Sequence, residues 1–147
     1  EFIRTKLKSF EALFKQHNQT IRLSNTDSPV SIWADPTRFN QLLDNLLSNA
    51  NRYTDDGGQI HIAIQHNASI TTLIIEDSAP SVSNEALTQL FDHLYRTEQS
   101  RNRNSGGSGL GLAICKRIVE GHNGIISASH SELGGVAIHI ELPVETL

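Results

Sequence analysis

Side chains that alternate between apolar and polar at every second position mark two segments of the sequence as strands with one buried face. In QIHIAIQ the isoleucines at 60, 62 and 64 share one side, and GVAIHIEL repeats the pattern from Val136 to Leu142. Turn residues join each segment to a second apolar run, TTLIIED or GIISAS. Strands grouped in such pairs favour a mainly antiparallel sheet over a doubly wound parallel sheet. The predicted strands of these two hairpins are 59–65, 71–77, 124–129 and 135–142.

Helical periodicity fills the segments before and between these hairpins. The clearest helix begins at Pro36 with Asp35 as its N-cap, carries an apolar stripe from Phe39 to Ala50, and ends near Tyr53. The expected architecture is α+β, a two-layer sandwich in which helices cover a mixed, mainly antiparallel sheet. The other predicted helices cover 4–17, 84–91 and the segment from the glycine run to Glu120, and two further short strands are predicted at 20–24 and 30–34.

Composition limits the classes of protein to which this chain can belong. A length of 147 residues, 37% of them apolar, suits one domain over 1–147. The net charge of −4 argues against a nucleic-acid partner, since such proteins usually carry a basic excess. No apolar run approaches the roughly 20 residues of a spanning helix, so we expect a soluble piece. The single cysteine, Cys115, cannot form an internal disulfide and is interpreted as a packing residue in a reducing compartment.

Four glycines stand in the stretch GGSGLG, 106–111, directly before a helical pattern. Backbone amides at a helix N-terminus form an anion site, and glycine allows the backbone to approach a phosphate closely. The stretch does not match a Walker loop, which needs a lysine where Leu112 stands, or the dinucleotide fingerprint, which needs a preceding strand. Taken alone, these glycines are equally typical of a flexible hinge.

Two other groups of polar residues accompany the glycines. Asn45, Asn49 and Arg52 are spaced by four and three positions, which places them along one edge of the long helix. An asparagine carbonyl can complete a Mg²⁺ shell and an arginine can grip a phosphate, although a solvated helix flank has the same pattern. Asp77 ends a buried strand, where a carboxylate needs a donor such as the exocyclic amine of adenine or the amides of the next turn.

In this order, the motifs resemble the ATP-binding catalytic domain of sensor histidine kinases. The wider superfamily also contains type II topoisomerases, large ATP-dependent heat-shock chaperones and MutL mismatch-repair proteins. NLLSNANRY is similar to the N box, DSAP to the G1 box, LFDHLYR to the F box and GGSGLGLAI to the G2 box, and HNG and the closing GG…ELP also match. DSAP and the segment after the F box are most similar to envelope-stress sensor kinases and related regulators of efflux.

The resemblance implies a Bergerat-type fold that binds ATP and Mg²⁺ under a lid running from Phe91 to Ser108. Asn49 would bind Mg²⁺ with Asn45 beside it, and Asp77 would accept a hydrogen bond from adenine N6. Arg52 and Tyr53 would contact phosphate and nucleotide, and the glycine amides would meet the phosphates. The implied ATP-binding residues are Asn45, Asn49, Arg52, Tyr53, Asp77, Ala79, Pro80, Arg96, Arg101, Gly107, Gly109, Leu110, Gly111 and Leu112, with Arg103 as a further candidate for the γ-phosphate.

The sequence departs from the family pattern in two places. The G1 box usually carries glycines where Ala79 and Ser81 stand, which leaves open how closely the backbone approaches adenine. Relatives that hydrolyse ATP carry a water-activating glutamate in the place of Asn45, and an amide cannot take a proton, so we expect poor hydrolysis. None of the seven histidines has the phosphoacceptor pattern, and His61 and His139 are expected to be solvated on outward strand positions.

The function that the resemblance implies is that of a histidine protein kinase fragment. It would donate the γ-phosphoryl group of ATP to a histidine on a separate dimerisation domain, and it is not expected to autophosphorylate in isolation. The implied full-length protein is a membrane-anchored homodimer of a two-component system, with this domain in the cytoplasm and a response regulator as an indirect partner. The alternatives are a nucleotide-sensing or protein-docking module without transfer activity, and an ATPase of the chaperone or topoisomerase type.

Overall fold

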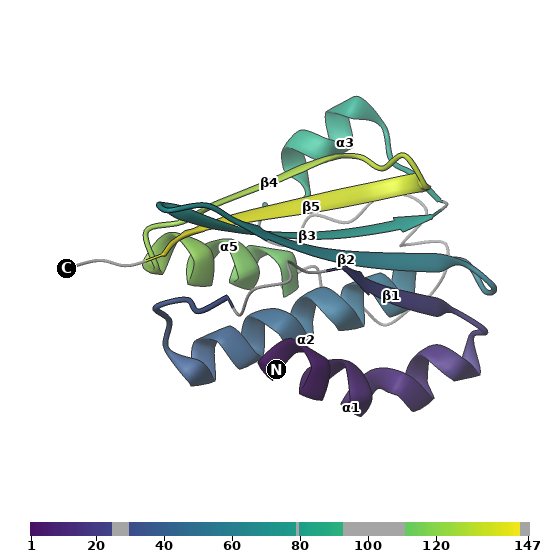
Figure 1. The fold of residues 1–147 in the computed structure, drawn as a ribbon. Coiled ribbons are helices and arrows are strands. Elements are labelled where there is room, and N and C mark those ends of the chain that lie inside the picture. The colour runs from purple at the N-terminus through teal and green to yellow at the C-terminus, as the bar shows by residue number, and fades with distance from the viewer. Residues whose placement is uncertain (25–29, 79, 93–110, 145–147) are drawn as a thin grey trace.

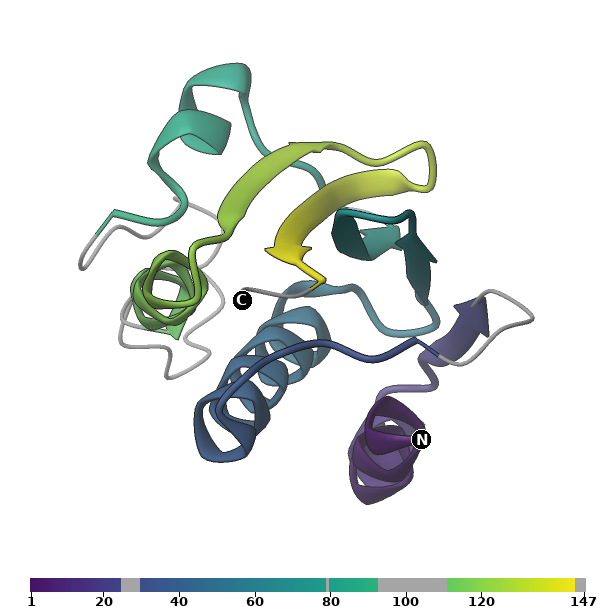
Figure 2. The same ribbon diagram turned by 60° about the vertical axis from the view of Figure 1, so that its left-hand side comes forward.

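The structure, a computed structural model, describes residues 1–24, 30–78, 80–92 and 111–144. Figure 1 shows one sheet with three helices beneath it and a short helix above β4, and Figure 2 shows the same layers after a rotation. The helices are α1 (Phe2–Gln16), α2 (Pro36–Tyr53), α3 (Asn84–Gln89) and α5 (Gly111–Gly121). The strands are β1 (Thr20–Ser24), β2 (Gln59–His66), β3 (Ile70–Ser78), β4 (Ile125–His130) and β5 (Gly134–Pro143).

The sheet has five strands in the order β1-β2-β3-β5-β4. β1 pairs with β2 in parallel, and the pairs β2–β3, β3–β5 and β4–β5 are antiparallel. The predicted mixed, mainly antiparallel sheet with two hairpins is therefore confirmed. β5 follows the other strands in the sequence but lies inside the sheet, between β3 and β4.

One face of the sheet is covered by α1, α2 and α5, as both views show, while α3 lies beside β4. The core fills the space between the two layers. Fully burying an aliphatic side chain contributes roughly 1.5–3 kcal/mol, so this core is the main source of stability. Within the described ranges, no helix has the length and apolarity needed to cross a membrane. The most deeply buried core residues are Leu42, Leu43, Leu46, Leu47, Ile60, Ile62, Cys115, Val119 and Ile140.

Helix α2 begins as the sequence predicts. Asp35 Oδ1 accepts hydrogen bonds from the backbone N–H groups of Thr37 at 2.9 Å and Arg38 at 3.2 Å, and Pro36 stands in the first turn. The backbone N–H of Asp35 in turn donates to His122 Nε2 at 3.1 Å, just beyond the C-terminal end of α5. The end of α5 therefore meets the start of α2, so the two helices run antiparallel and the first turn of α5 lies toward the second half of α2.

The prediction of a strand at 30–34 is wrong. Ile32 packs against the core while Ser31 and Trp33 are exposed, Trp33 by 73%, so burial alternates along this segment as it would along a strand. It arises because this segment crosses the edge of the core on its way to the N-cap of α2, without joining the sheet. Alternation shows which side chains are buried, and it does not show whether the backbone has a ladder partner.

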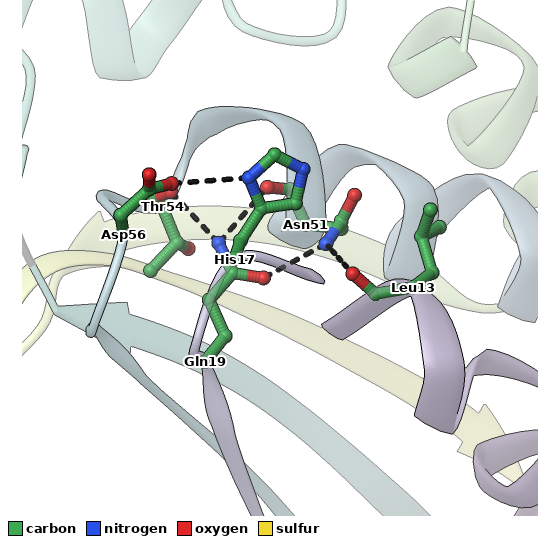
Figure 3. Close-up of polar contacts among 6 residues, drawn as sticks. All are labelled: Leu13, His17, Gln19, Asn51, Thr54 and Asp56. Atoms are coloured by element: carbon green, nitrogen blue, oxygen red, sulfur yellow. Dashed lines mark hydrogen bonds and ion pairs between the residues drawn. The ribbon is translucent and has the colours of Figure 1, made fainter. Parts of the chain in front are cut away.

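A buried polar cluster joins the junction between α1 and β1 to the end of α2 (Figure 3). Gln19, 7% exposed, donates from Nε2 to the carbonyl oxygens of Asn51 at 3.0 Å and Thr54 at 2.8 Å. Its Oε1 accepts from Asn51 Nδ2 at 2.8 Å. At the surface, His17 Nδ1 lies 3.0 Å from Asp56 Oδ1. Carbonyls in the last turn of a helix have no partners within the helix, so Gln19 fixes where α2 ends.

Across the outward face of the sheet, side chains form a hydrogen-bonded row. His61 Nε2 lies 2.9 Å from Ser24 Oγ, and its Nδ1 lies 3.3 Å from Glu76 Oε1. His61 faces outward as predicted, but its side chain is only 19% exposed, so the expectation that it is solvated is wrong. His139 also has a partner, Ser129 Oγ at 3.1 Å. The row has the order of a Ser–His–acid triad, but His61 and Glu76 are direct cross-strand neighbours, so sheet register alone accounts for it.

Candidate functional site

Three parts of the chain that the sequence singles out lie along the second half of α2. Asp77, near the end of β3, pairs with Ile60 at the start of β2, a few residues after α2 ends. Ser78 Oγ accepts a 2.9 Å hydrogen bond from the backbone N–H of Gln59, which ties the end of β3 to the α2–β2 turn. The antiparallel packing of α5 on α2 brings Gly111 toward the second half of α2, where Asn45 and Asn49 stand.

Asp77 is a half-buried acid whose carboxylate has few donors. Its Oδ1 accepts a 2.9 Å hydrogen bond from the backbone N–H of Val136 on β5. Burial raises its pKa from 3.8 to about 6; the Val136 N–H opposes this rise, the charge of Glu76 adds to it, and the Thr54 hydroxyl weakly opposes it. The Thr54 hydroxyl is buried near this carboxylate, but no described atom lies in the right position to form a hydrogen bond with it. Asp77 is therefore an under-satisfied acceptor, suited to a ligand amine.

A glycine on the neighbouring strand makes room for this acid. A Cβ atom at Gly135 would collide with Asp77 Oδ1 and with the backbone oxygens of Asp77 and Ser78. Backbone atoms cannot rotate away as the end of a flexible side chain can, so a larger residue at this position would displace β3 from β5. Gly135 is the first residue of the predicted strand 135–142, and its contact with Asp77 was not predicted; a glycine within a strand was the available signal of a close backbone approach.

The side chain of Asn45 places an N–H donor in the interior. Its Nδ2 is shielded from solvent and has no hydrogen-bond partner among the described residues. A buried amide that lacks a partner costs roughly 1–3 kcal/mol, so such groups are uncommon in folded proteins unless a ligand supplies the partner. An N–H donor suits an anionic oxygen and cannot ligate a cation.

The other predicted residues of α2 lie where the helical spacing places them. Asn49 is half-buried, four residues after Asn45, while Arg52 is exposed and Tyr53 is half-buried in the last turn. In the described ranges there is no cluster of three or more His, Cys, Asp or Glu that could hold a metal ion. A cation here would therefore depend mainly on oxygens that a ligand brings with it, completed by a carboxamide such as that of Asn49.

At the start of α5, Gly111 and Leu112 are half-buried, and Leu112 packs against the core. A Cβ added at Gly111 would meet no atom within 4 Å, so packing does not require glycine there. Pro80 is half-buried in the connection from β3 to α3. The remaining predicted residues lie outside the described ranges: Ala79, Arg96, Arg101, Arg103, Gly107, Gly109 and Leu110, together with the lid beyond Asp92.

Comparison with known proteins agrees with these features. Residues 34–146 match the family model described as histidine kinase-, DNA gyrase B-, and HSP90-like ATPase. Over 137 residues the chain is 49% identical to the signal transduction histidine-protein kinase BaeS of Escherichia coli (strain K12), which covers 93% of this chain and 29% of BaeS. The chain thus spans less than a third of this relative.

Solved structures of histidine kinases resemble this fold. The catalytic domain of histidine kinase ThkA, in a nucleotide-free form, superposes with a TM-score of 0.86 at 27% identity, covering 97% of this chain and 90% of that one. A structure of histidine kinase ThkA in complex with the response regulator protein TrrA matches with a TM-score of 0.81 at 27% identity. That match covers 98% of this chain and 40% of the ThkA chain.

Proposed function

The chain belongs to the histidine kinase-, DNA gyrase B-, and HSP90-like ATPase family as a histidine-kinase catalytic domain, and from this premise we propose that it binds Mg·ATP and donates the γ-phosphoryl group to a histidine on a separate dimerisation domain. Its relatives are named sensor histidine kinases, which are enzymes. The expected resemblance to sensor kinases, BaeS among them, is confirmed.

Two polar side chains with unused hydrogen-bonding capacity, one an acceptor and one a donor, support the proposal. Asp77 is an acceptor short of donors, and Asn45 is a buried donor without a described acceptor. A purine with an exocyclic amine supplies a donor to the first, and a phosphate oxygen supplies an acceptor to the second. ATP carries both groups in one molecule, and a charge-assisted bond to its amine is worth on the order of 1.5–3 kcal/mol.

We assign the phosphate side of the site to α2 and the start of α5. Arg52 would grip a phosphate and Tyr53 would contact the nucleotide, while the backbone amides at Gly111 and Leu112 would add the positive end of the α5 dipole. Ala79 and Pro80 would border the base. Arg96, Arg101, Gly107, Gly109 and Leu110 remain predictions that rest on the family resemblance.

Mg²⁺ fits this assignment. A carboxamide oxygen is a hard ligand, so Asn49 can complete a shell that phosphate oxygens and water otherwise provide. When bound, the ion would neutralise charge that develops on the phosphates during transfer. The protein's own part is to hold the triphosphate still and to exclude competing geometries.

The transfer needs no covalent step on this chain. A ring nitrogen of the acceptor histidine forms a bond to the γ-phosphorus, the bond from that phosphorus to the β,γ-bridging oxygen breaks, and ADP leaves while the imidazole releases its proton to solvent. Water is a poor competitor, because the amide of Asn45 cannot act as a general base. We therefore assign no catalytic acid or base to this domain.

The remaining parts of the proposal concern the whole protein, of which residues 1–147 would be the catalytic fragment. The full-length kinase would be a membrane-anchored homodimer whose dimerisation domain carries the acceptor histidine. The complex of ThkA with TrrA supports a response regulator as the subsequent partner.

The direct test combines binding and transfer. Titration of the chain with ATP, with and without Mg²⁺, should show saturable binding that Asp77→Asn weakens by about tenfold or more. Mixing it with a separately produced dimerisation domain and γ-labelled ATP should give acid-labile phosphohistidine on that domain. Binding without transfer would favour the nucleotide-sensing alternative, and steady phosphate release without an acceptor would favour a chaperone-like ATPase. Absence of binding in wild type would remove the proposal altogether.

A further inference from the structure

We propose that His130 is a positioning residue for the base side of the nucleotide site, acting through Ser81. This inference rests on the function proposed above and adds a residue that the motifs do not contain. His130 is the last residue of β4, and it contacts the connection between β3 and α3 that follows Asp77. The proposed role is to hold that connection in one position relative to the β4–β5 hairpin.

His130 joins two points of this connection. Its Nδ1 lies 2.9 Å from Ser81 Oγ, and its Nε2 lies 2.6 Å from Asn84 Oδ1, on the first residue of α3. The Ser81 hydroxyl donates to the carbonyl oxygen of Gly135 at 3.2 Å, and the imidazole tautomer sets the direction of the two His130 contacts. The ring therefore spans from the residue after Pro80 to the start of α3.

The same hairpin also controls Asp77. Gly135 packs against Asp77 without room for a Cβ atom, and the next residue, Val136, donates its backbone N–H to Asp77 Oδ1. The carbonyl oxygen of Gly135 accepts from both Ser81 Oγ and the backbone N–H of Ser131, at 2.9 Å for the latter. Gly135 and Val136 of β5 thus contact both the Asp77 carboxylate and the β3–α3 connection.

This arrangement explains the departure from the G1 pattern at Ser81. A glycine at that position leaves the backbone free to adapt to the base, whereas a serine adds a hydroxyl that can be tied down. Here that hydroxyl bridges His130 and Gly135, so the connection is held by side-chain hydrogen bonds. Because His130 itself is exposed and lies outside the core, its loss should change the position of this connection more than the stability of the fold.

The test measures base recognition separately from folding. Dissociation constants for Mg·ATP and Mg·GTP, and the melting temperature, are compared for wild type, His130→Ala, His130→Asn and His139→Ala. GTP has a carbonyl in place of the amine that faces Asp77, so it reports on the phosphate side alone. His139 is the matched control, because it is an outward histidine on the same hairpin whose side-chain partner among the described residues is Ser129.

We expect His130→Ala to weaken ATP binding about three- to tenfold, the range of one hydrogen bond, while GTP binding changes less than twofold. His130→Asn should recover most of the loss, because its carboxamide can stand where Nδ1 stands and contact Ser81 Oγ as donor or as acceptor, and His139→Ala should match wild type. In a Ser81→Ala background, His130→Ala should add little further loss, since the two side chains act as one unit.

Two results overturn the inference while leaving the proposed function intact. One is ATP binding by His130→Ala that equals wild type. The other is an equal loss for ATP and GTP that follows a lower melting temperature, which is the signature of a purely structural role. Failure of the wild-type chain to bind ATP would remove both proposals, and it is visible in the wild-type titration before any variant is compared.

Discussion

The backbone N–H of Val136 donates to the carboxylate of Asp77 at 2.9 Å, across the boundary between β5 and β3. This is the strongest of the influences that favour the charged form of the acid, yet burial outweighs it and the pKa stands at about 6. The acid therefore changes charge close to neutral pH, and its behaviour can be followed both in stability and in binding.

Without nucleotide, stability should fall as the pH rises from 4 to 7. Because folding raises the pKa of Asp77, its contribution favours the folded state below the ordinary value of 3.8 and is lost as pH rises through about 6. The expected loss is on the order of 2 kcal/mol in the free energy of unfolding. Urea titrations of wild type and Asp77→Asn over this pH range isolate the contribution of Asp77 to the free energy of unfolding, and Glu11→Gln serves as an exposed control. Parallel pH curves for wild type and Asp77→Asn would contradict the assignment.

ATP binding should have the opposite pH dependence. The charged carboxylate is the better acceptor for an amine, so affinity should rise as the pH increases through about 6. Asp77→Asn should lack this component, and the difference between the two titration series removes the contribution from the nucleotide's own phosphates. A pH dependence that survives unchanged in the variant would assign the base contact to another residue.

Asn45→Leu should stabilise the free chain and weaken the complex. The near-isosteric leucine removes a buried amide whose nitrogen has no described partner, which should raise the free energy of unfolding by about 1 kcal/mol. The same change should lower ATP affinity. Asn51→Leu is the matched control, because Asn51 Nδ2 donates to Gln19 Oε1 at 2.8 Å, and its loss should destabilise the chain by about 2 kcal/mol. If both variants lower the free energy of unfolding, the Asn45 amide has a hydrogen-bond partner in the free protein.

Gly135→Ala should destabilise the fold, because the new methyl group collides with the backbone of β3. Overpacking of this kind costs about 1–3 kcal/mol, and thermal unfolding would show it. Gly121→Ala serves as the control, since a Cβ at the end of α5 meets no atom within 4 Å and alanine favours helices. Equal melting temperatures for the two variants would mean that β3 and β5 can accommodate a methyl group at position 135.

The Cys115 thiol should be inert in the folded chain. It is fully buried between helices, and burial raises its pKa to about 12, so almost no thiolate exists at pH 8. Reaction with a disulfide reagent should be slow in buffer and become complete, at one thiol per chain, in urea. Rapid labelling under native conditions would mean that α5 separates readily from the core.

Sequence reasoning succeeds here where periodicity is strong and local. The apolar stripe of α2 and the alternation in β2 and β5 predict those elements, and Asp35 with Pro36 predicts where α2 begins. It fails at 30–34, because alternation reports burial and the partly buried Ile32 packs against the core without a strand partner.

The contacts that the sequence analysis missed are those between distant residues. Gln19 lies 32 residues before Asn51, and His130 lies 49 residues after Ser81, so no local pattern joins either pair. The family motifs contain both Asp77 and Gly135 but do not show that the two are in contact, because this contact depends on which strands are neighbours. Motifs locate the acid, and only the sheet order shows what limits the space around it.

The position of β5 has a consequence for biosynthesis. This strand is made after its neighbours β3 and β4, yet it separates them in the sheet. Until the ribosome has released residues up to Pro143, the backbone N–H and C=O groups along this edge of β3 lack their partner strand, and we expect nascent chains to expose them for pairing with other molecules. Synthesis of this domain should therefore depend on holdase chaperones more than its modest size suggests, and premature stops before Gly134 should yield aggregates rather than smaller folded products.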